Sequence, residues 1–147
     1  MALSGNSLFF GEMGRMLSQR QKTSVLVVDD DPGMTETLAD IFAMKGFDVR
    51  TAASGEDAIA LAGERKIHFV LMDIKMPGMN GVQTMHALKK IQPQATVILM
   101  TGYAMDDLID EGLRTGACCV HRKPLDLDAL LADVEKMTGD TPGPLSL

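Results

Sequence analysis

Residues 24–28, Ser24-Val25-Leu26-Val27-Val28, form an uninterrupted apolar run rich in β-branched side chains, and three aspartates, Asp29-Asp30-Asp31, follow at once. A short apolar run without polar alternation predicts a strand that is buried on both of its faces. Such strands are typical of parallel sheets that helices cover on both sides. In open sheets of this kind, ligands bind beyond the carboxyl ends of the strands. The three aspartates therefore stand where a functional site is expected.

The same alternation of apolar runs and helical patterns continues outward to residue 137. Further strands are predicted at residues 47–52, 68–72, 96–100 and 117–121, and helices at residues 32–45, between Ser54 and Gly63, and at residues 81–91, 106–114 and 126–137. Pro32 suits a first helical turn, and Gly46 suits a helix stop. Five strands alternating with five helices predict an α/β fold, a doubly wound (βα)5 sandwich with a parallel sheet and helices on both faces.

Length and charge limit the functions that the chain can have. Its 147 residues are enough for one domain, and its net charge is −6. An acidic surface repels phosphate backbones, so we expect no direct binding to nucleic acid. No segment approaches the roughly 20 apolar residues of a membrane span, and no basic region precedes the short apolar run near the N-terminus. We therefore expect no membrane association.

Cysteine and histidine positions do not predict a metal site. Cys118 and Cys119 are adjacent, which is not the spacing of a zinc site or a redox pair, so we interpret them as two small buried hydrophobic residues. Unpaired thiols fit a cytoplasmic protein. His68, His86 and His121 are scattered and have no acid partner at a regular spacing. We therefore expect no metal or phosphohistidine role for them.

The two ends of the chain differ from its middle. Residues 1–22 are predicted to be an N-terminal arm that is flexible or partly helical, residues 23–137 the domain itself, and residues 138–147, with two prolines and two glycines, a flexible C-terminal tail. An alternative for the arm is an amphipathic segment that packs on a partner or a second copy. Its apolar residues recur at helical spacing: Phe9, Met13, Met16 and Leu17.

Polar side chains follow four of the predicted strands, namely Asp29, Asp30, Asp73, Thr101 and Lys123. Three carboxylates cannot lie together in ionised form without a counter-charge. Oxygen ligands without histidine or cysteine favour Mg²⁺, which shares its coordination with phosphate groups. A carboxylate can then act as nucleophile and form an acyl phosphate. A lysine would neutralise one phosphoryl oxygen, and a threonine hydroxyl would donate a hydrogen bond to another.

Four motifs together resemble the receiver domain of two-component response regulators, of the chemotaxis-regulator type. They are Val27-Val28-Asp29-Asp30-Asp31, Met72-Asp73-Ile74-Lys75-Met76-Pro77-Gly78-Met79-Asn80-Gly81, Thr101-Gly102-Tyr103 and Lys123-Pro124. The resemblance covers about residues 23–137. It implies a flavodoxin-like fold whose five-stranded parallel sheet has the strand order 2-1-3-4-5. It also implies a cis peptide bond between Lys123 and Pro124.

The resemblance implies roles for the acidic residues. Asp73 would be the phosphoacceptor. Mg²⁺ would be bound by the side chains of Asp30 and Asp73 and by the backbone carbonyl of Lys75. Asp29 would act on the metal mainly through a water molecule.

The resemblance also implies a switch, from which this sequence departs at one position. Thr101 would move toward the phosphoryl group, and Lys123 would contact it. A second switch residue, three positions before the lysine, is usually aromatic in the family, but here it is Val120. Tyr103 is a candidate for part of that role. We also hypothesise that Tyr103 and Lys75 flank the site and slow the attack of water on the acyl phosphate.

The function predicted from these motifs is that of a phosphoacceptor rather than an enzyme, although it would assist its own phosphorylation and dephosphorylation. A sensor histidine kinase or a phosphotransfer protein would phosphorylate Asp73, and the added charge would switch a surface that binds a downstream protein. That surface, or a homodimer contact, is expected on the helix at 106–114, the strand at 117–121 and the helix at 126–137.

Three alternatives remain open at the level of sequence. The chain could be the receiver part of a longer transcriptional regulator or hybrid kinase. It could be a receiver-like domain that no longer switches. It could also be a phosphatase of the haloacid-dehalogenase type, which has an Asp-x-Asp motif after its first strand; its nucleophile would then be Asp29.

Overall fold

The computed structural model describes residues 22–104 and 106–138. Apart from Lys22 and Thr138, the predicted arm and the predicted tail lie outside the described residues, so both stay predictions. Within the described part, no helix is long and apolar enough to cross a membrane.

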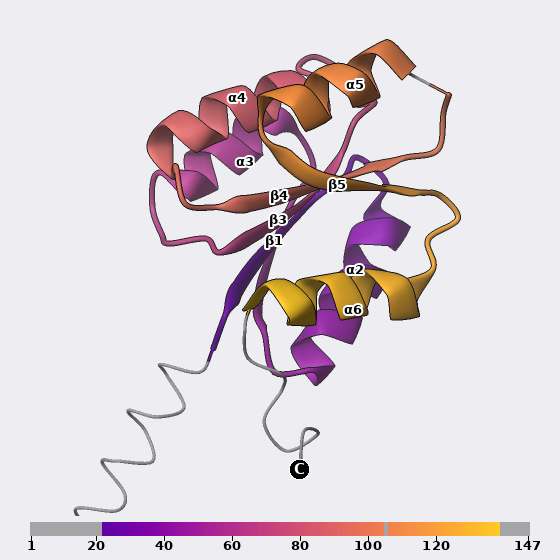
Figure 1. Cartoon of the computed structure of the whole chain (residues 1–147). Helices are drawn as coiled ribbons and strands as arrows, with labels where there is room; N and C mark the ends of the chain where they lie inside the picture. The colour runs from indigo at the N-terminus through magenta and orange to yellow at the C-terminus, as the bar shows by residue number, and fades with distance from the viewer. Residues whose placement is uncertain (1–21, 105, 139–147) are drawn as a thin grey trace, which may run out of the picture.

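Five parallel strands form one sheet in the order β2-β1-β3-β4-β5 (Figure 1). The strands are β1 (Ser24–Val28), β2 (Asp48–Ala52), β3 (Phe69–Asp73), β4 (Thr96–Thr101) and β5 (Ala117–Arg122). The helices are α2 (Pro32–Met44), α3 (Gly55–Ala62), α4 (Gly81–Ile91), α5 (Asp106–Thr115) and α6 (Leu127–Thr138). The predicted α/β sandwich and the strand order 2-1-3-4-5 are confirmed.

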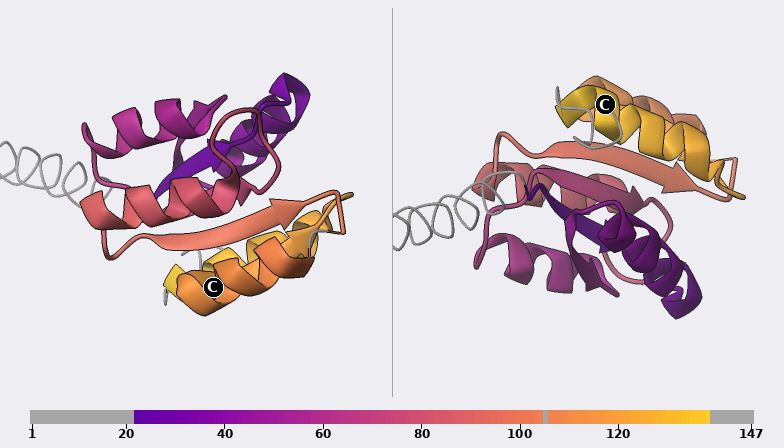
Figure 2. Two further views of the ribbon diagram at one scale, coloured as in Figure 1. Left: turned by 90° about the horizontal axis from the view of Figure 1, so that it is seen from above. Right: turned by 90° about the horizontal axis from the view of Figure 1, so that it is seen from below.

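The helices form two layers, one on each face of the sheet. Helices α3, α4 and α5 cover one face, and α2 and α6 cover the other (Figure 1). Both α5 and α6 lie at the β5 side of the molecule, on opposite faces of the sheet (Figure 1 and Figure 2). The face expected to carry the output surface is therefore built from α5, β5 and α6.

Successive side chains of the central strands point to opposite faces of the sheet and so contribute to two hydrophobic cores. In β1, Leu26 and Val28 belong to the core under α3–α5, whereas Val25 and Val27 belong to the core under α2 and α6. Every residue of β1 and β3 is buried. This confirms that an uninterrupted apolar run marks a strand covered on both faces.

The strands end later than the sequence pattern predicts. Asp73 and Thr101 are the last residues of β3 and β4, and Arg122 is the last residue of β5. The apolar pattern stops before these polar residues, but the hydrogen-bond ladder continues through them. Two of the predicted site residues are therefore held by the sheet itself and not by flexible loops.

Strand β5 differs from the buried strands because it lies at the edge of the sheet. Its register with β4 shifts between Val97 and Ile98, which pair with Ala117 and Cys119, so that Cys118 is the extra residue of a bulge. Cys118 is exposed and Cys119 is half-buried. The interpretation of both cysteines as buried hydrophobic residues is therefore wrong for Cys118, because an edge strand is covered less completely than a central one.

Candidate functional site

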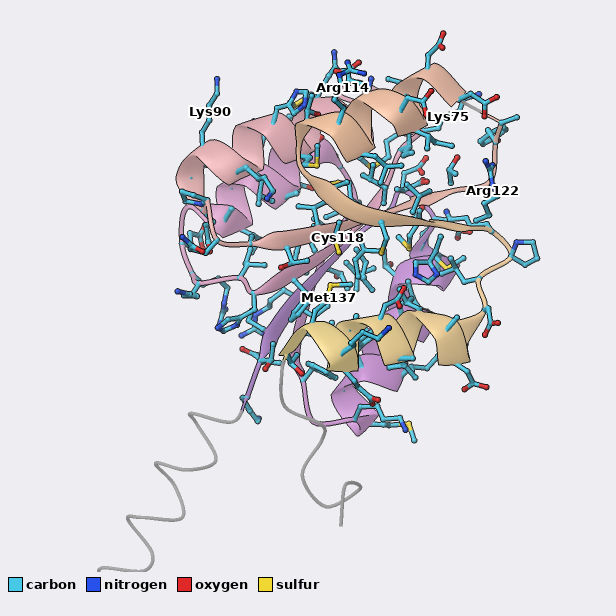
Figure 3. The ribbon with its side chains drawn as sticks, in the orientation of Figure 1. Lys75, Lys90, Arg114, Cys118, Arg122 and Met137 are labelled. Atoms are coloured by element: carbon cyan, nitrogen blue, oxygen red, sulfur yellow. The ribbon has the colours of Figure 1, made fainter. Side chains whose placement is uncertain are left out.

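Four strand ends meet in one cleft at the carboxyl edge of the sheet. The cleft has a volume of about 660 Å³ and is lined by Asp29, Asp30, Asp31, Asp73, Lys75, Met76, Pro77, Gly102, Tyr103 and Lys123. Lys75 lies at the same end of the molecule as Arg122, the last residue of β5 (Figure 3). The expectation that polar residues after the strands gather in one place therefore agrees with the structure for Asp29, Asp30, Asp73 and Lys123, whereas Thr101 is buried and does not line the cleft.

Three carboxylates form the centre of the cleft. Asp29 and Asp73 are 1% and 6% exposed, whereas Asp30 is exposed. One oxygen from each of the three lies within 4.8 Å of the others. Asp31 stands apart in function: its side chain accepts a hydrogen bond from the Gly33 amide at 3.0 Å and caps α2. That capping role is the one expected of an acid at a helix start.

Lys123 supplies a positive charge to this group. Its ammonium nitrogen lies 2.6 Å from Asp29 Oδ2 and 3.5 Å from Asp73 Oδ1. Its backbone amide donates a 2.7 Å hydrogen bond to the carbonyl of Thr101. The peptide bond between Lys123 and Pro124 is cis, as expected. The lysine is therefore fixed at its backbone and at its ammonium group.

Asp73 and Lys123 alter each other's protonation. Burial, and then the negative charge of Asp29, raise the pKa of Asp73 to about 6, although Lys123 opposes the shift. Burial acts to lower the pKa of Lys123, but its hydrogen bond to Asp29 and the charges of Asp73 and Asp29 outweigh burial and raise that pKa. The three carboxylates thus carry more negative charge than Lys123 alone compensates.

The donor set fits a hard divalent cation. All the ligand atoms offered by the three aspartates are oxygens, and two of these carboxylates are buried close to one another. A cation such as Mg²⁺ would remove the repulsion that raises the pKa of Asp73.

Thr101 is buried, and its hydroxyl is engaged by the following turn. Thr101 Oγ1 donates to the carbonyl of Tyr103 at 3.0 Å and accepts from the Tyr103 amide at 3.1 Å. In this state the hydroxyl is held by Tyr103. Any motion of the threonine toward Asp73 must break or re-form these hydrogen bonds, which couples Thr101 to Tyr103 through the backbone.

Tyr103 and Lys75 form a pair at the mouth of the cleft. The Lys75 ammonium lies 4.3 Å from the centre of the Tyr103 ring, within the range of a cation–π contact. The tyrosine is 57% exposed. Val120 is placed differently: it is half-buried and packs against the core under α3–α5. The structure thus brings Tyr103 and Lys75 to the cleft, while Val120 does not line it.

Gly81 has a role that the sequence analysis missed. A Cβ atom on Gly81 would collide with the carbonyl oxygen of Asp73. The Gly81 amide donates a 2.7 Å hydrogen bond to the carbonyl of Ile74, and Asn80 and Gln83 form a capping box at the same helix end. The first turn of α4 therefore approaches the backbone of Asp73 closely, and only glycine permits this approach.

A second cluster of possible ligands also escaped the sequence analysis. His121 Nε2 lies 2.7 Å from Asp133 Oδ2, so this histidine has an acid partner in space although none is indicated by the sequence spacing. The partner comes from α6, twelve residues along the chain, where no regular spacing connects it to β5.

The surroundings of Asp29 argue against the phosphatase alternative, in which Asp29 would be the nucleophile. One of its oxygens accepts the Asp31 amide at 3.0 Å, and the other is paired with Lys123. A carboxylate that is 1% exposed and engaged at both oxygens is poorly placed to attack an external phosphate ester.

Comparisons with known proteins agree with this geometry. The chain is 34% identical over 112 residues to sporulation initiation phosphotransferase F of Bacillus subtilis, covering 76% of this chain and 90% of that protein. It is also 34% identical over 122 residues to the transcriptional regulatory protein ZraR of Salmonella typhimurium, covering 83% of this chain but 28% of ZraR.

A solved structure shows the same fold with a modified site. The response regulator protein from Burkholderia pseudomallei, solved with a phosphorylated aspartic acid, a calcium ion and citrate, matches with a TM-score of 0.71 and 30% identity over 76% of this chain and 65% of that chain. The family model of the response regulator receiver domain matches residues 25–135. The chain therefore belongs to the family of response regulator receiver domains.

Proposed function

We propose that Asp73 is the residue of this receiver domain that accepts a phosphoryl group. The observation that carries the proposal is the burial of its carboxylate at the base of the cleft, 3.5 Å from the Lys123 ammonium. The phosphorylated aspartic acid in the related Burkholderia pseudomallei structure supports it. The donor is the phosphorylated histidine of a sensor kinase or of a phosphotransfer protein.

Mg²⁺ is the proposed cofactor of this reaction. Asp30 and Asp73 would hold it through their side chains and Lys75 through its backbone carbonyl, while Asp29 would act through a water molecule. When bound, the ion supplies positive charge that offsets the negative charge of the phosphoryl oxygens. The oxygen-only donor set supports this choice, as does the divalent calcium ion in the related structure.

The chain's own residues position and neutralise the reacting groups. An oxygen of Asp73 attacks phosphorus while the bond to the donor nitrogen breaks, which leaves an acyl phosphate on Asp73. Lys123 already lies beside both buried carboxylates, so it can pair with a phosphoryl oxygen after only a small movement. Catalysis here is mainly positioning and charge neutralisation.

The output is proposed to begin at Thr101. Its hydroxyl would leave the carbonyl of Tyr103 and donate to a phosphoryl oxygen, and the linked turn would move with it. Since Val120 cannot act as an aromatic switch, Tyr103 is the proposed reporter. The surface that responds is the face of α5, β5 and α6, where a downstream protein or a second copy of the chain would bind.

The wider context of the domain is also a proposal. Because the chain spans 28% of ZraR, it could serve as the receiver part of a longer regulator, whose output would then lie in another domain. Because it spans 90% of sporulation initiation phosphotransferase F, it could equally act as a single domain. The cytoplasm is the proposed compartment, since both cysteines are free and that compartment keeps thiols reduced.

The test is to phosphorylate the protein and map the modified residue. The chain is incubated with Mg²⁺ and the small phosphodonor acetyl phosphate, and the acyl phosphate is reduced with borohydride and located by mass spectrometry. We expect the label on Asp73 and none in Asp73→Asn. Asp31→Asn is the matched control, because Asp31 caps α2, and it should be labelled normally. A label on Asp29, or turnover of an external phosphate ester, would contradict the proposal.

A further inference from the structure

Beyond the phosphorylation cleft, β5 and α6 bring a thiol, an imidazole and a carboxylate together. Cys119 and His121 are two positions apart on β5 and so share one face of the strand. Asp133 comes from α6, which packs against that face. The bulge at Cys118 sets this register, because Cys118 is the extra residue and Cys119 pairs with Ile98.

The distances suit one shared ion. His121 Nε2 lies 2.7 Å and Cys119 Sγ lies 3.8 Å from Asp133 Oδ2, and the three ligand atoms are all within 4.8 Å of one another. Ligands of a tetrahedral zinc ion are separated by roughly 3.3 to 3.7 Å, given zinc–ligand bonds of about 2.0 to 2.3 Å. Small side-chain adjustments would bring the three groups to that spacing.

We propose that Cys119, His121 and Asp133 form a binding site for a Zn²⁺-type transition-metal ion between β5 and α6. The ligand types distinguish it from the oxygen-only cleft, because thiolate and imidazole groups select zinc-like ions over Mg²⁺. All three residues are half-buried, and a water molecule would supply the fourth ligand of a four-coordinate ion. This inference does not depend on the proposed phosphorylation of Asp73.

Metal binding at this site requires a proton to leave. Burial, and then the neighbouring Cys118 and Asp133, raise the pKa of Cys119 to about 12. A cysteine binds zinc as its thiolate, so the thiol must give up its proton when the metal binds. Binding forms a sulfur–zinc bond in place of the sulfur–hydrogen bond and releases one proton to solvent, so the affinity should rise with pH.

Cys118 provides a matched control close to the site. It lies on β5 next to Cys119, but its Sγ contacts Met137 Sδ of α6 at 3.3 Å and it is exposed (Figure 3). A Cys118→Ser variant removes the neighbouring thiol and leaves the three proposed ligands in place.

The experiment uses Co²⁺ as a spectroscopic substitute for Zn²⁺. The full chain, kept reduced, is titrated in saturating Mg²⁺ so that the cleft around Asp73 is not available to cobalt. We expect near-ultraviolet sulfur-to-cobalt absorption, visible bands of four-coordinate cobalt, and displacement by one equivalent of Zn²⁺. Cys119→Ser should lose the near-ultraviolet band, and Cys118→Ser should keep it. Absence of the band in the unmodified chain, or its loss in Cys118→Ser, overturns the proposal.

Two further measurements test Asp133 and the thiol of Cys119 without relying on the serine variant. Asp133→Asn should bind Zn²⁺ at least about tenfold more weakly; an unchanged affinity excludes Asp133 as a ligand and overturns the three-residue site. Calorimetry of the unmodified chain in two buffers of different ionisation enthalpy should show that protons are released when Zn²⁺ binds. Zinc binding without proton release would mean that the thiol is not a ligand.

Discussion

The ammonium group of Lys123 lies 2.6 Å from a carboxylate oxygen of Asp29, a residue that is 1% exposed. The two residues are 94 positions apart in the chain, so the contact joins the ends of β1 and β5 across the sheet. A buried carboxylate that loses its partner is costly, because its charge is neither hydrated nor paired. This ion pair therefore contributes to stability as well as to the chemistry of the cleft.

Replacing Lys123 should show how much the ion pair contributes to stability. Lys123→Met should lower the free energy of unfolding by about 3 kcal/mol in the absence of Mg²⁺, since Asp29 is left unpaired. Saturating Mg²⁺ should restore part of the loss, because the ion supplies the missing positive charge. Urea unfolding with and without Mg²⁺ measures both effects, and Lys123→Arg serves as the charge-retaining control. A loss of equal size in both conditions would show that charge is not the cause.

A second prediction concerns the close approach of α4 to β3. Gly81→Ala places a Cβ against the carbonyl oxygen of Asp73, so the helix must move away. We expect a loss of about 2 kcal/mol in the free energy of unfolding, typical of overpacking in a closed region, together with weaker Mg²⁺ binding. The chain has one tyrosine and no tryptophan, so Tyr103 fluorescence reports on the cleft during a Mg²⁺ titration.

The control for Gly81 is Gly63, at the C-terminus of α3. Its φ is −78°, and the nearest atom to an added Cβ is 3.5 Å away. Gly63→Ala should change stability by no more than about 0.5 kcal/mol and leave Mg²⁺ binding unchanged. Equal effects of the two substitutions would show that the contact with Asp73 is not responsible for the special cost at Gly81.

The fold could be predicted because its signals are local. An apolar run such as residues 24–28 predicts a strand covered on both sides, and Pro32 and Gly46 predict the start and the stop of a helix, so the five strands and five helices of the described residues agree with the sequence pattern. The strand order came from family resemblance and not from spacing. The predicted strands end one residue before β3 and β4 do. A pattern of apolar residues does not reveal that the backbone hydrogen bonds of the sheet continue to Asp73 and Thr101.

The sequence predicts those residues of the site that come directly after a strand. Asp29, Asp73 and Lys123 meet as expected because parallel strands end at one edge. Contacts that depend on register were not predictable. Cys118 is exposed on the edge strand β5 as the extra residue of a bulge against β4, and the partner of His121 comes from the packing of α6 on β5. The spacing of residues along the sequence predicts neither feature.

A third prediction tests whether Tyr103 shields the acyl phosphate. The cation–π contact between Lys75 and Tyr103 lies over the cleft and is worth about 0.5–1 kcal/mol at an exposed position. If it limits the access of water, Tyr103→Ala should lose phosphate about two- to fivefold faster. Tyr103→Phe, which keeps the ring, should decay at the original rate. Release of radiolabelled phosphate from the phosphorylated chain measures this rate, and equal rates for all three proteins would rule out shielding by the ring.

A fourth prediction concerns the effect of pH on stability through His68, which lies at the opposite end of the strands from the cleft. The Ser24 amide donates a 3.0 Å hydrogen bond to His68 Nδ1, which requires that this nitrogen be unprotonated. Partial burial, and then the charge of Lys66, lower the pKa of His68 below its usual 6.5. The unfolded chain therefore binds a proton more readily than the folded one once the pH falls below about 6.5. Stability from this residue is complete above that pH and is lost progressively as the pH falls toward the lowered pKa.

His68→Asn isolates this contribution, because the Asn Oδ1 atom can accept from Ser24 without titrating. The difference in the free energy of unfolding between the original chain and His68→Asn should change between pH 7.5 and pH 5, with the original chain losing stability relative to the variant at the acid end. Lys66→Gln removes the second cause of the shift and should make this pH-dependent difference smaller. Urea unfolding across the pH range measures each value. Parallel curves for the original chain and His68→Asn would mean that protonation of His68 is not linked to folding.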